Sequence, residues 1–146
     1  MKIVSFFFVL ISACAFSQSS EELQIKASIN SLFDGMKTSD STKITNAFSK
    51  TALLQTIAKN GEVKNENIKD FVVSISKAVK GSLDERITFS NILIDGNLAS
   101  VWTPYEFYYQ GKFSHCGVNS FQLVKINNEW KIQYIIDTRR KDNCKK

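Results

Sequence analysis

Residues 98–140 read LASVWTPYEFYYQGKFSHCGVNSFQLVKINNEWKIQYIIDTRR. β-Branched and aromatic residues dominate this stretch, while Gln110-Gly111 and Asn127-Asn128 are residue pairs that favour tight turns. The pattern therefore predicts three long antiparallel strands, preceded by a strand over residues 86–94, in a four-strand meander. The three long strands are expected over residues 98–109, 112–126 and 129–138.

The preceding part of the chain has the pattern of three helices and one hairpin. Residues that favour a helix start occur at three places, and after each of them apolar residues recur at helical spacing. These starts are expected at Ser19 or Ser20, at Asp40, and at Asn65 or Asn67. Between the second and third helices, residues 51–58 favour a strand and Asn60-Gly61 favours a hairpin turn.

This order of elements predicts the fold class. Long strands twist and curl, so a long meander can bend around helices. We therefore expect an α+β cone in which three helices pack in a strongly curved, mostly antiparallel sheet. A single domain over residues 18–146 accounts for the whole pattern, with a short basic tail over residues 139–146.

The first seventeen residues are typical of a secretory signal peptide. Lys2 precedes the apolar run 3–13, which is too short to span a bilayer, and residues 15–17 resemble a cleavage site. We expect an exported protein, periplasmic or secreted, whose mature chain starts at Gln18 and has no transmembrane segment. Two alternatives stay open: a lipid anchor on Cys14, and a buried N-terminal helix that is not removed.

The cysteines and the charge limit the classes of partner. Removal of residues 1–17 leaves Cys116 and Cys144, which can form one disulfide in an oxidising compartment or remain two independent thiols. One histidine and the absence of a Cys-x-x-Cys pair argue against a metal site, and no motif for a cofactor is present. The net charge of +5 becomes +4 without Lys2, and the tail 139–146 carries all of this remainder, so no nucleic-acid surface is expected.

The candidate site lies on the second and third of the four meander strands. A two-residue turn at Gln110-Gly111 places Glu106 opposite His115, the only histidine, unless a bulge or bend at Pro104 shifts the register by one residue. Strand alternation then gathers aromatic and polar side chains on one face, as a cavity wall requires. The residues expected on that face include Trp102, Glu106, Tyr108, Phe113, His115, Asn119 and Phe121.

Three residues are candidates for acid–base chemistry. Glu106 opposite His115 would orient the imidazole and favour its protonated form. Asp137 is the second candidate partner, but it shares a face with His115 only if a three-residue loop or a bulge shifts the last strand. Arg139 lies on the face of Asp137 and is expected to hold an anionic group of a ligand, or only to pair with Asp137.

The order of elements and the string Glu129-Trp130-Lys131-Ile132 resemble the nuclear transport factor 2-like superfamily. Residues 111–117 and 137–140 are similar, more narrowly, to its exported bacterial branch named putative lumazine-binding, near SnoaL-like proteins. The resemblance covers residues 22–141 and implies the cone fold. It implies little about function, since the superfamily includes ketosteroid isomerase, scytalone dehydratase, polyketide cyclases and non-catalytic binding domains.

Three hypotheses about function follow. The first is an exported small-molecule-binding protein with a pocket between the sheet and the helices. The second is a cofactor-independent lyase or isomerase that uses His115 with Glu106 or Asp137. The third is an interaction domain without a ligand, because superfamily sheets often pair; the expected homodimer surface is the outer sheet face with Tyr105, Phe107 and Tyr109.

Overall fold

The computed structural model describes residues 4–144, and it describes side-chain environments from Ser20 onward. Residues 1–3 of the predicted signal peptide lie outside this range. Within it, the chain forms three helices and seven strands. In chain order these are α1 (Val4–Thr38), α2 (Ser41–Ala47), β1 (Phe48–Ile57), β2 (Val63–Glu66), α3 (Ile68–Ser76), β3 (Leu83–Ile87), β4 (Asn91–Asp95), β5 (Leu98–Tyr109), β6 (Lys112–Ile126) and β7 (Glu129–Arg140).

Side-chain caps start the two short helices where the sequence predicts them. The Asp40 carboxylate accepts hydrogen bonds from the backbone N–H groups of Thr42 and Lys43, both at 3.0 Å. The Asn67 side chain accepts in the same way from the N–H group of Lys69, at 2.9 Å. Each cap satisfies donors that the first helical turn leaves free.

Helix α1 is longer than predicted. It begins at Val4 and continues through Ser20, so the helix start expected at Ser19 or Ser20 is wrong. The residues between the apolar run and Ser20 include no proline or glycine that would end a helix. The stripe expected at its C-terminal end is confirmed, since its members are at most 8% exposed. These are Ile25, Ile29, Leu32, Phe33 and Met36.

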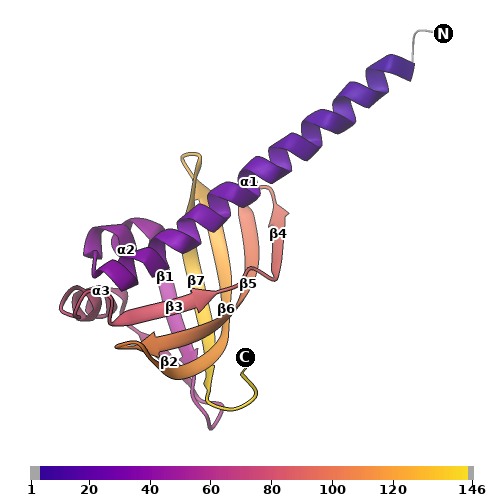
Figure 1. Ribbon diagram of the computed structural model, residues 1–146. Helices are drawn as coiled ribbons and strands as arrows, with labels where there is room; N and C mark the ends of the chain where they lie inside the picture. The colour runs from indigo at the N-terminus through magenta and orange to yellow at the C-terminus, as the bar shows by residue number, and fades with distance from the viewer. Residues whose placement is uncertain (1–3, 145–146) are drawn as a thin grey trace.

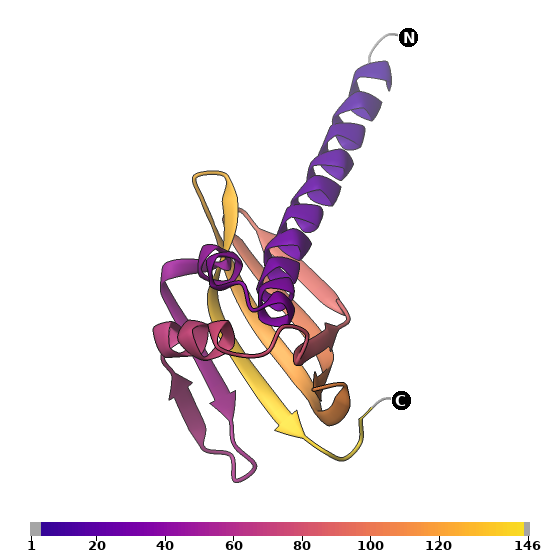
Figure 2. The same cartoon turned by 60° about the vertical axis from the view of Figure 1, so that its left-hand side comes forward.

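The seven strands form one curved sheet in the order β2-β1-β7-β6-β5-β3, and β4 pairs with β5 beside β3. All pairs are antiparallel except β1 with β7. Helix α1 crosses the concave side of the sheet, and α2 and α3 lie on the same side (Figure 1 and Figure 2). The predicted α+β cone with a mostly antiparallel sheet is confirmed.

The strand predicted over residues 86–94 is two strands. Strand β3 pairs with the second half of β5 and β4 with the first half. The break lies beside Pro104, whose carbonyl accepts from the Thr88 N–H group at 2.9 Å. Because the N–H and C=O groups of an antiparallel residue point to the same side, the missing N–H group of Pro104 faces this edge and interrupts the ladder.

The hydrophobic core fills the space between α1 and strands β5–β7. Phe121, Leu123 and Ile132 from the sheet are completely buried, and so are Ile25 and Ile29 from the helix. The Phe33 and Phe121 rings meet edge to face, with centroids 6.2 Å apart. Each buried large side chain stabilises the fold by about 1.5–3 kcal/mol relative to an exposed one, so this layer holds the helix against the sheet.

A disulfide ties the C-terminal tail to the sheet. It joins Cys116 of β6 to Cys144, and the Cα atoms of the two residues are 5.8 Å apart. Cys116 lies opposite Arg140, the last residue of β7, so the tail must turn back toward β6 after that strand. Of the two alternatives, the structure contains the disulfide rather than two free thiols.

Candidate functional site

A β-bulge in the turn-proximal part of β6 changes which residues share a face. Tyr108 pairs with Phe113, but Phe107 pairs with His115, so Ser114 is an extra residue in β6. Beyond the bulge, Glu106 lies opposite Cys116 instead of His115. The predicted Glu106–His115 pair is therefore wrong, since a one-residue shift moves a side chain to the other face.

Four of the predicted cavity residues lie on the convex face as a result. The Tyr108 hydroxyl donates to the Glu106 carboxylate at 3.0 Å, and the Arg86 guanidinium lies 4.0 Å from the centroid of the Tyr108 ring. Phe113 packs against Tyr108 and remains 46% exposed, and Trp102 is 48% exposed. Glu106, Tyr108 and Phe113 form an outer cluster with Arg86, and neither this cluster nor Trp102 lines the concave cavity.

A second bulge brings Asp137 onto the concave face. Gln122 pairs with Tyr134 and Leu123 with Ile132, so Gln133 is an extra residue in β7. Asp137 consequently lies opposite Asn119, whose side chain is buried. Of the two arrangements left open by the sequence, the structure has the bulged one.

The concave face carries a polar cluster in which Asn119, Asp137 and Tyr105 are buried. The Asn119 amide group donates to the Glu85 carboxylate at 2.8 Å. The Oδ2 atom of Asp137 accepts from Arg139 Nε at 2.8 Å and from the Tyr105 hydroxyl at 3.3 Å. Asp137 is only 7% exposed, and its Oδ1 atom has no hydrogen-bond partner among the described residues.

Gly117 allows Tyr105 to reach this cluster. A Cβ atom at residue 117 would lie 2.8 Å from Cε1 of Tyr105 and 1.8 Å from the carbonyl oxygen of Thr138, so no other residue fits there. The Tyr105 hydroxyl also donates to that carbonyl at 2.9 Å, which fixes the ring. Burial, with the nearby Asp137 and Glu85 carboxylates, raises the pKa of Tyr105, so the hydroxyl remains a donor.

Glu85 is a carboxyl group of the cluster with a raised pKa. Burial raises the pKa of its carboxyl group to about 7; the hydrogen bond from Asn119 opposes this shift, and the charge of Asp137 adds to it. At neutral pH Glu85 therefore exists in both protonation states. A carboxyl group of this kind can donate or accept a proton beside a bound molecule.

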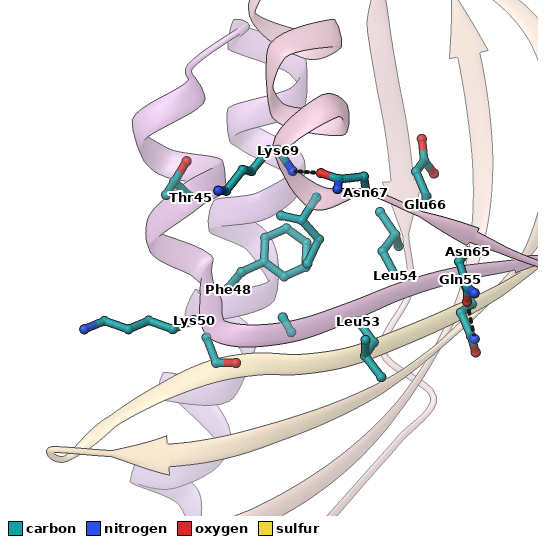
Figure 3. Close-up of a pocket in the computed structure, with 13 residues that line it drawn as sticks. Thr45, Phe48, Lys50, Leu53, Leu54, Gln55, Asn65, Glu66, Asn67 and Lys69 are labelled. Carbon is teal, nitrogen blue, oxygen red and sulfur yellow. Dashed lines mark hydrogen bonds between the residues drawn. The ribbon is translucent and has the colours of Figure 1, made fainter.

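The polar cluster forms one end of a cavity of about 80 Å³ between the sheet and α1, and its other walls are largely apolar. The aromatic walls are Phe33, Phe71 and Phe121. An open groove of about 780 Å³ lies next to it, between β1, β2 and the ends of α2 and α3 (Figure 3). Phe48, Leu54 and Glu66 line both spaces.

Asn119, Phe121, Asp137 and Arg139, all predicted from the sequence, line this cavity. Their roles in binding or catalysis remain predictions. His115 is on the same face, but within the described residues no hydrogen bond joins it to Asp137. Its Nδ1 atom lies 3.1 Å from the Ser114 hydroxyl. Burial and the charge of Arg139 lower its pKa, contrary to the protonated imidazole expected.

The surface predicted for a homodimer is also changed by the bulges. Tyr105 is 4% exposed, Phe107 packs against the core, and both contact the His115 ring on the concave side. Tyr109 is half exposed. The expected outer face with all three residues is therefore wrong, and dimerisation itself remains a prediction.

Sequence reasoning missed Glu85. Glu85 precedes the strand predicted over residues 86–94. It lies two residues from both Leu83 and Ile87, so it shares their inward face of β3 although it is charged. That alternation was the available signal.

Within the described residues, no group of three His, Cys, Asp or Glu side chains could hold a metal ion. In that same part of the chain, none of the helices has the length and apolar character needed to cross a membrane.

An α+β fold whose curved sheet encloses helices and a part-polar cavity is the architecture of nuclear transport factor 2-like proteins. Solved structures support this fold class. One such protein of unknown function, from Shewanella baltica OS155, has a TM-score of 0.68 and 20% identity, over 84% of this chain and 95% of that chain. Another of unknown function, from Silicibacter pomeroyi DSS-3, has a TM-score of 0.69 and 15% identity, over 84% and 98%. A protein from Streptomyces avermitilis described as a "putative dehydratase" of the NTF2-like family has a TM-score of 0.62 and 9% identity, over 84% of this chain and 98% of that chain.

The sequence also matches a family model. The model described as "Putative lumazine-binding" covers residues 20–134, and the chain belongs to this family. No curated protein matches the sequence. The family supports a ligand-binding domain, while the structural neighbours, all at most 20% identical here, show the fold alone.

Proposed function

We propose that the concave cavity binds a small, partly aromatic molecule that presents hydrogen-bond donors to Glu85 and Asp137. The observation that carries this proposal is the Oδ1 atom of Asp137, which is buried at the cavity and has no hydrogen-bond partner among the described residues. Leaving a buried carboxylate oxygen unpaired is costly. An N–H or O–H group of a ligand would satisfy this atom.

The apolar walls support a flat ring as the ligand. Phe33, Phe71 and Phe121 offer aromatic surface, and the two carboxyl groups and Asn119 lie together at one end. Such a site combines apolar area for affinity with a few polar groups for orientation. The family description names lumazine, a bicyclic heteroaromatic compound with ring N–H groups, which fits this chemistry.

Entry requires the adjacent groove to open toward the cavity. The cavity volume of about 80 Å³ is below the roughly 300 Å³ at which small-molecule sites begin. Phe48, Leu54 and Glu66 are the side chains that line both spaces, and Figure 3 shows them along the groove. Helix α3 lies on the other side of the groove; only its Ile75 is buried, while Ile68, Phe71 and Val72 pack against the core partly exposed. A displacement of α3 would therefore merge the two spaces.

The test is a titration of the purified protein with lumazine and with a metabolite library, followed by tryptophan fluorescence and thermal shift. Glu85→Gln and Asp137→Asn should each weaken binding about tenfold or more, because each loses a charged hydrogen-bond acceptor. Glu106→Gln is the matched control on the convex face and should bind normally. Absence of any ligand, or equal binding by all four proteins, would rule the proposal out.

The protonation of Glu85 favours a second candidate function, a lyase or isomerase without a cofactor. Its pKa of about 7 suits a group that moves a proton at neutral pH. Glu85 would then be the acid–base group, with Asp137 beside it, in place of the predicted Glu106–His115 pair. Turnover of a cavity ligand that survives in Glu85→Gln would exclude this function.

We also propose that the protein is exported. The charged and apolar pattern of residues 1–17 supports export, and the Cys116–Cys144 disulfide suits an oxidising compartment. Mass spectrometry of the mature protein distinguishes an N-terminus at Gln18 from a lipid on Cys14. An unprocessed chain in the cytoplasmic fraction would contradict export.

A further inference from the structure

A second cleft, of about 520 Å³, lies where the β1–β2 hairpin meets the end of β7 and the residue after it. Figure 1 and Figure 2 both show the tip of the hairpin beside the end of β7. Five of the nine lining residues are Lys or Arg and none is Asp or Glu. The five are Lys59, Lys64, Arg139, Arg140 and Lys141.

Most of this positive charge is unbalanced within the cleft. In the described part of the chain, Lys59, Lys64, Arg140 and Lys141 form no ion pair. Arg139 uses Nε to bind Asp137, but its side chain is 52% exposed, so the terminal nitrogens are free to donate outward. Like charges that share a cleft raise the local potential and attract anions.

The backbone holds these cations in place. Parallel pairing of Ile57 with Thr138 aligns the hairpin end with the end of β7. The disulfide at Cys144 restricts the tail that follows Lys141. His115 adds a part-buried imidazole to the wall. The backbone that carries the positive groups is therefore largely fixed before a ligand arrives, which reduces the entropy lost on binding.

We propose that this cleft is a binding site for a phosphate-bearing anion, distinct from the ligand of the concave cavity. The planar donor fork of Arg and the compact charge of Lys match phosphate oxygens. A volume of about 520 Å³ exceeds the needs of one inorganic ion and suits a phosphorylated small molecule or a phospholipid headgroup. The site does not depend on the cavity ligand, because only Arg139 lines both spaces.

The test uses pyrophosphate as the probe, titrated by calorimetry into the purified protein at low salt. The double variant Lys59→Ala/Lys64→Ala should bind about tenfold more weakly or worse, because it loses two charged donors. The matched control Lys77→Ala/Lys80→Ala removes two exposed charges that lie outside the cleft and should bind normally. Added salt should weaken wild-type binding.

Vesicles distinguish the source of the phosphate. Sedimentation is compared between vesicles of pure phosphatidylcholine and vesicles that also contain phosphatidylglycerol. Pyrophosphate binding that only the cleft variant loses supports a soluble phosphorylated ligand. Sedimentation with the vesicles that contain phosphatidylglycerol, but not with pure phosphatidylcholine, supports a lipid headgroup if only the cleft variant loses it. No binding to either probe, or equal losses in the two double variants, would overturn the proposal.

Discussion

The sheet carries carboxyl and aromatic groups on both faces, and their surroundings differ between the two faces. On the concave face, Asp137 of the adjacent β7 is buried with one oxygen unpaired, and Asn119 holds a Glu85 whose pKa is raised. On the convex face, Glu106 and Tyr108 pair with each other within reach of solvent. Identical chemical groups thus become candidates for function only where curvature and α1 remove water.

The largest expected difference between the faces is in stability. Phe121→Ala on the concave face removes a completely buried ring that contacts Phe33, and should lower the free energy of unfolding by about 3–5 kcal/mol. Phe113→Ala removes a ring that is 46% exposed on the convex face and should cost less than about 1 kcal/mol. Urea unfolding measures both. Similar losses would mean that the convex cluster is also buried, for example in a dimer.

The disulfide makes the next largest contribution to stability, and Cys116 lies on the convex face, opposite Glu106. Cys116 and Cys144 are 28 residues apart, so closing this loop should stabilise the protein by about 3–4 kcal/mol through the entropy of the unfolded chain. Cys144→Ser should lose this amount in thermal unfolding. Reductant should destabilise the wild type by a similar amount and leave the variant unchanged; an equal response of both proteins would contradict the assignment.

Glu85 gives the concave face a pH dependence. Its pKa is about 7 in the folded protein against an ordinary value of 4.5, so between these pH values the folded state keeps a proton that the unfolded state releases. Wild-type stability should therefore fall as the pH rises through this window, while Glu85→Gln lacks this component. Between pH 4.5 and pH 7, the free energy of unfolding of Glu85→Gln should rise relative to that of the wild type by at most about 3 kcal/mol. Above pH 7 this difference should stay constant.

Unfolding free energies measured at a series of pH values test this sign directly. The exchange of the neutral Glu85 carboxyl group for an amide at the Asn119 hydrogen bond shifts the Glu85→Gln curve by a constant amount, which does not affect its slope. A difference between the two proteins that is independent of pH would show that the Glu85 carboxyl group is well solvated.

The sequence predicts the long strands well because their signals are local. The bounds of β5 and β6 agree with the predicted ranges, since Gln110-Gly111 and Asn127-Asn128 mark their ends and alternation fills the interior. The order of helices, hairpin and meander was then sufficient for the fold class.

The candidate site was harder to predict because it depends on the bulges. The extra residues Ser114 and Gln133 reverse which face a neighbouring side chain occupies, and no local signal marks either of them. Asn119, Phe121 and Asp137 reach the cavity, whereas Trp102 and Glu106 lie outside it. A bulge forms where the packing of a curved sheet favours it, so its position is a property of the folded layers.

The smallest expected effects have opposite signs on the two faces. Thr103 is completely buried on the concave side, and its hydroxyl has no hydrogen-bond partner among the described residues. Thr103→Val exchanges this hydroxyl for a methyl group of similar size and should stabilise the protein by about 1 kcal/mol. On the convex side, Ser100→Ala removes a 2.7 Å hydrogen bond to Gln122 and should destabilise it by about the same amount. Urea midpoints of the two variants should therefore move in opposite directions. Destabilisation by Thr103→Val would mean that its hydroxyl is satisfied by water, and that the concave face is wetter than its apolar walls indicate.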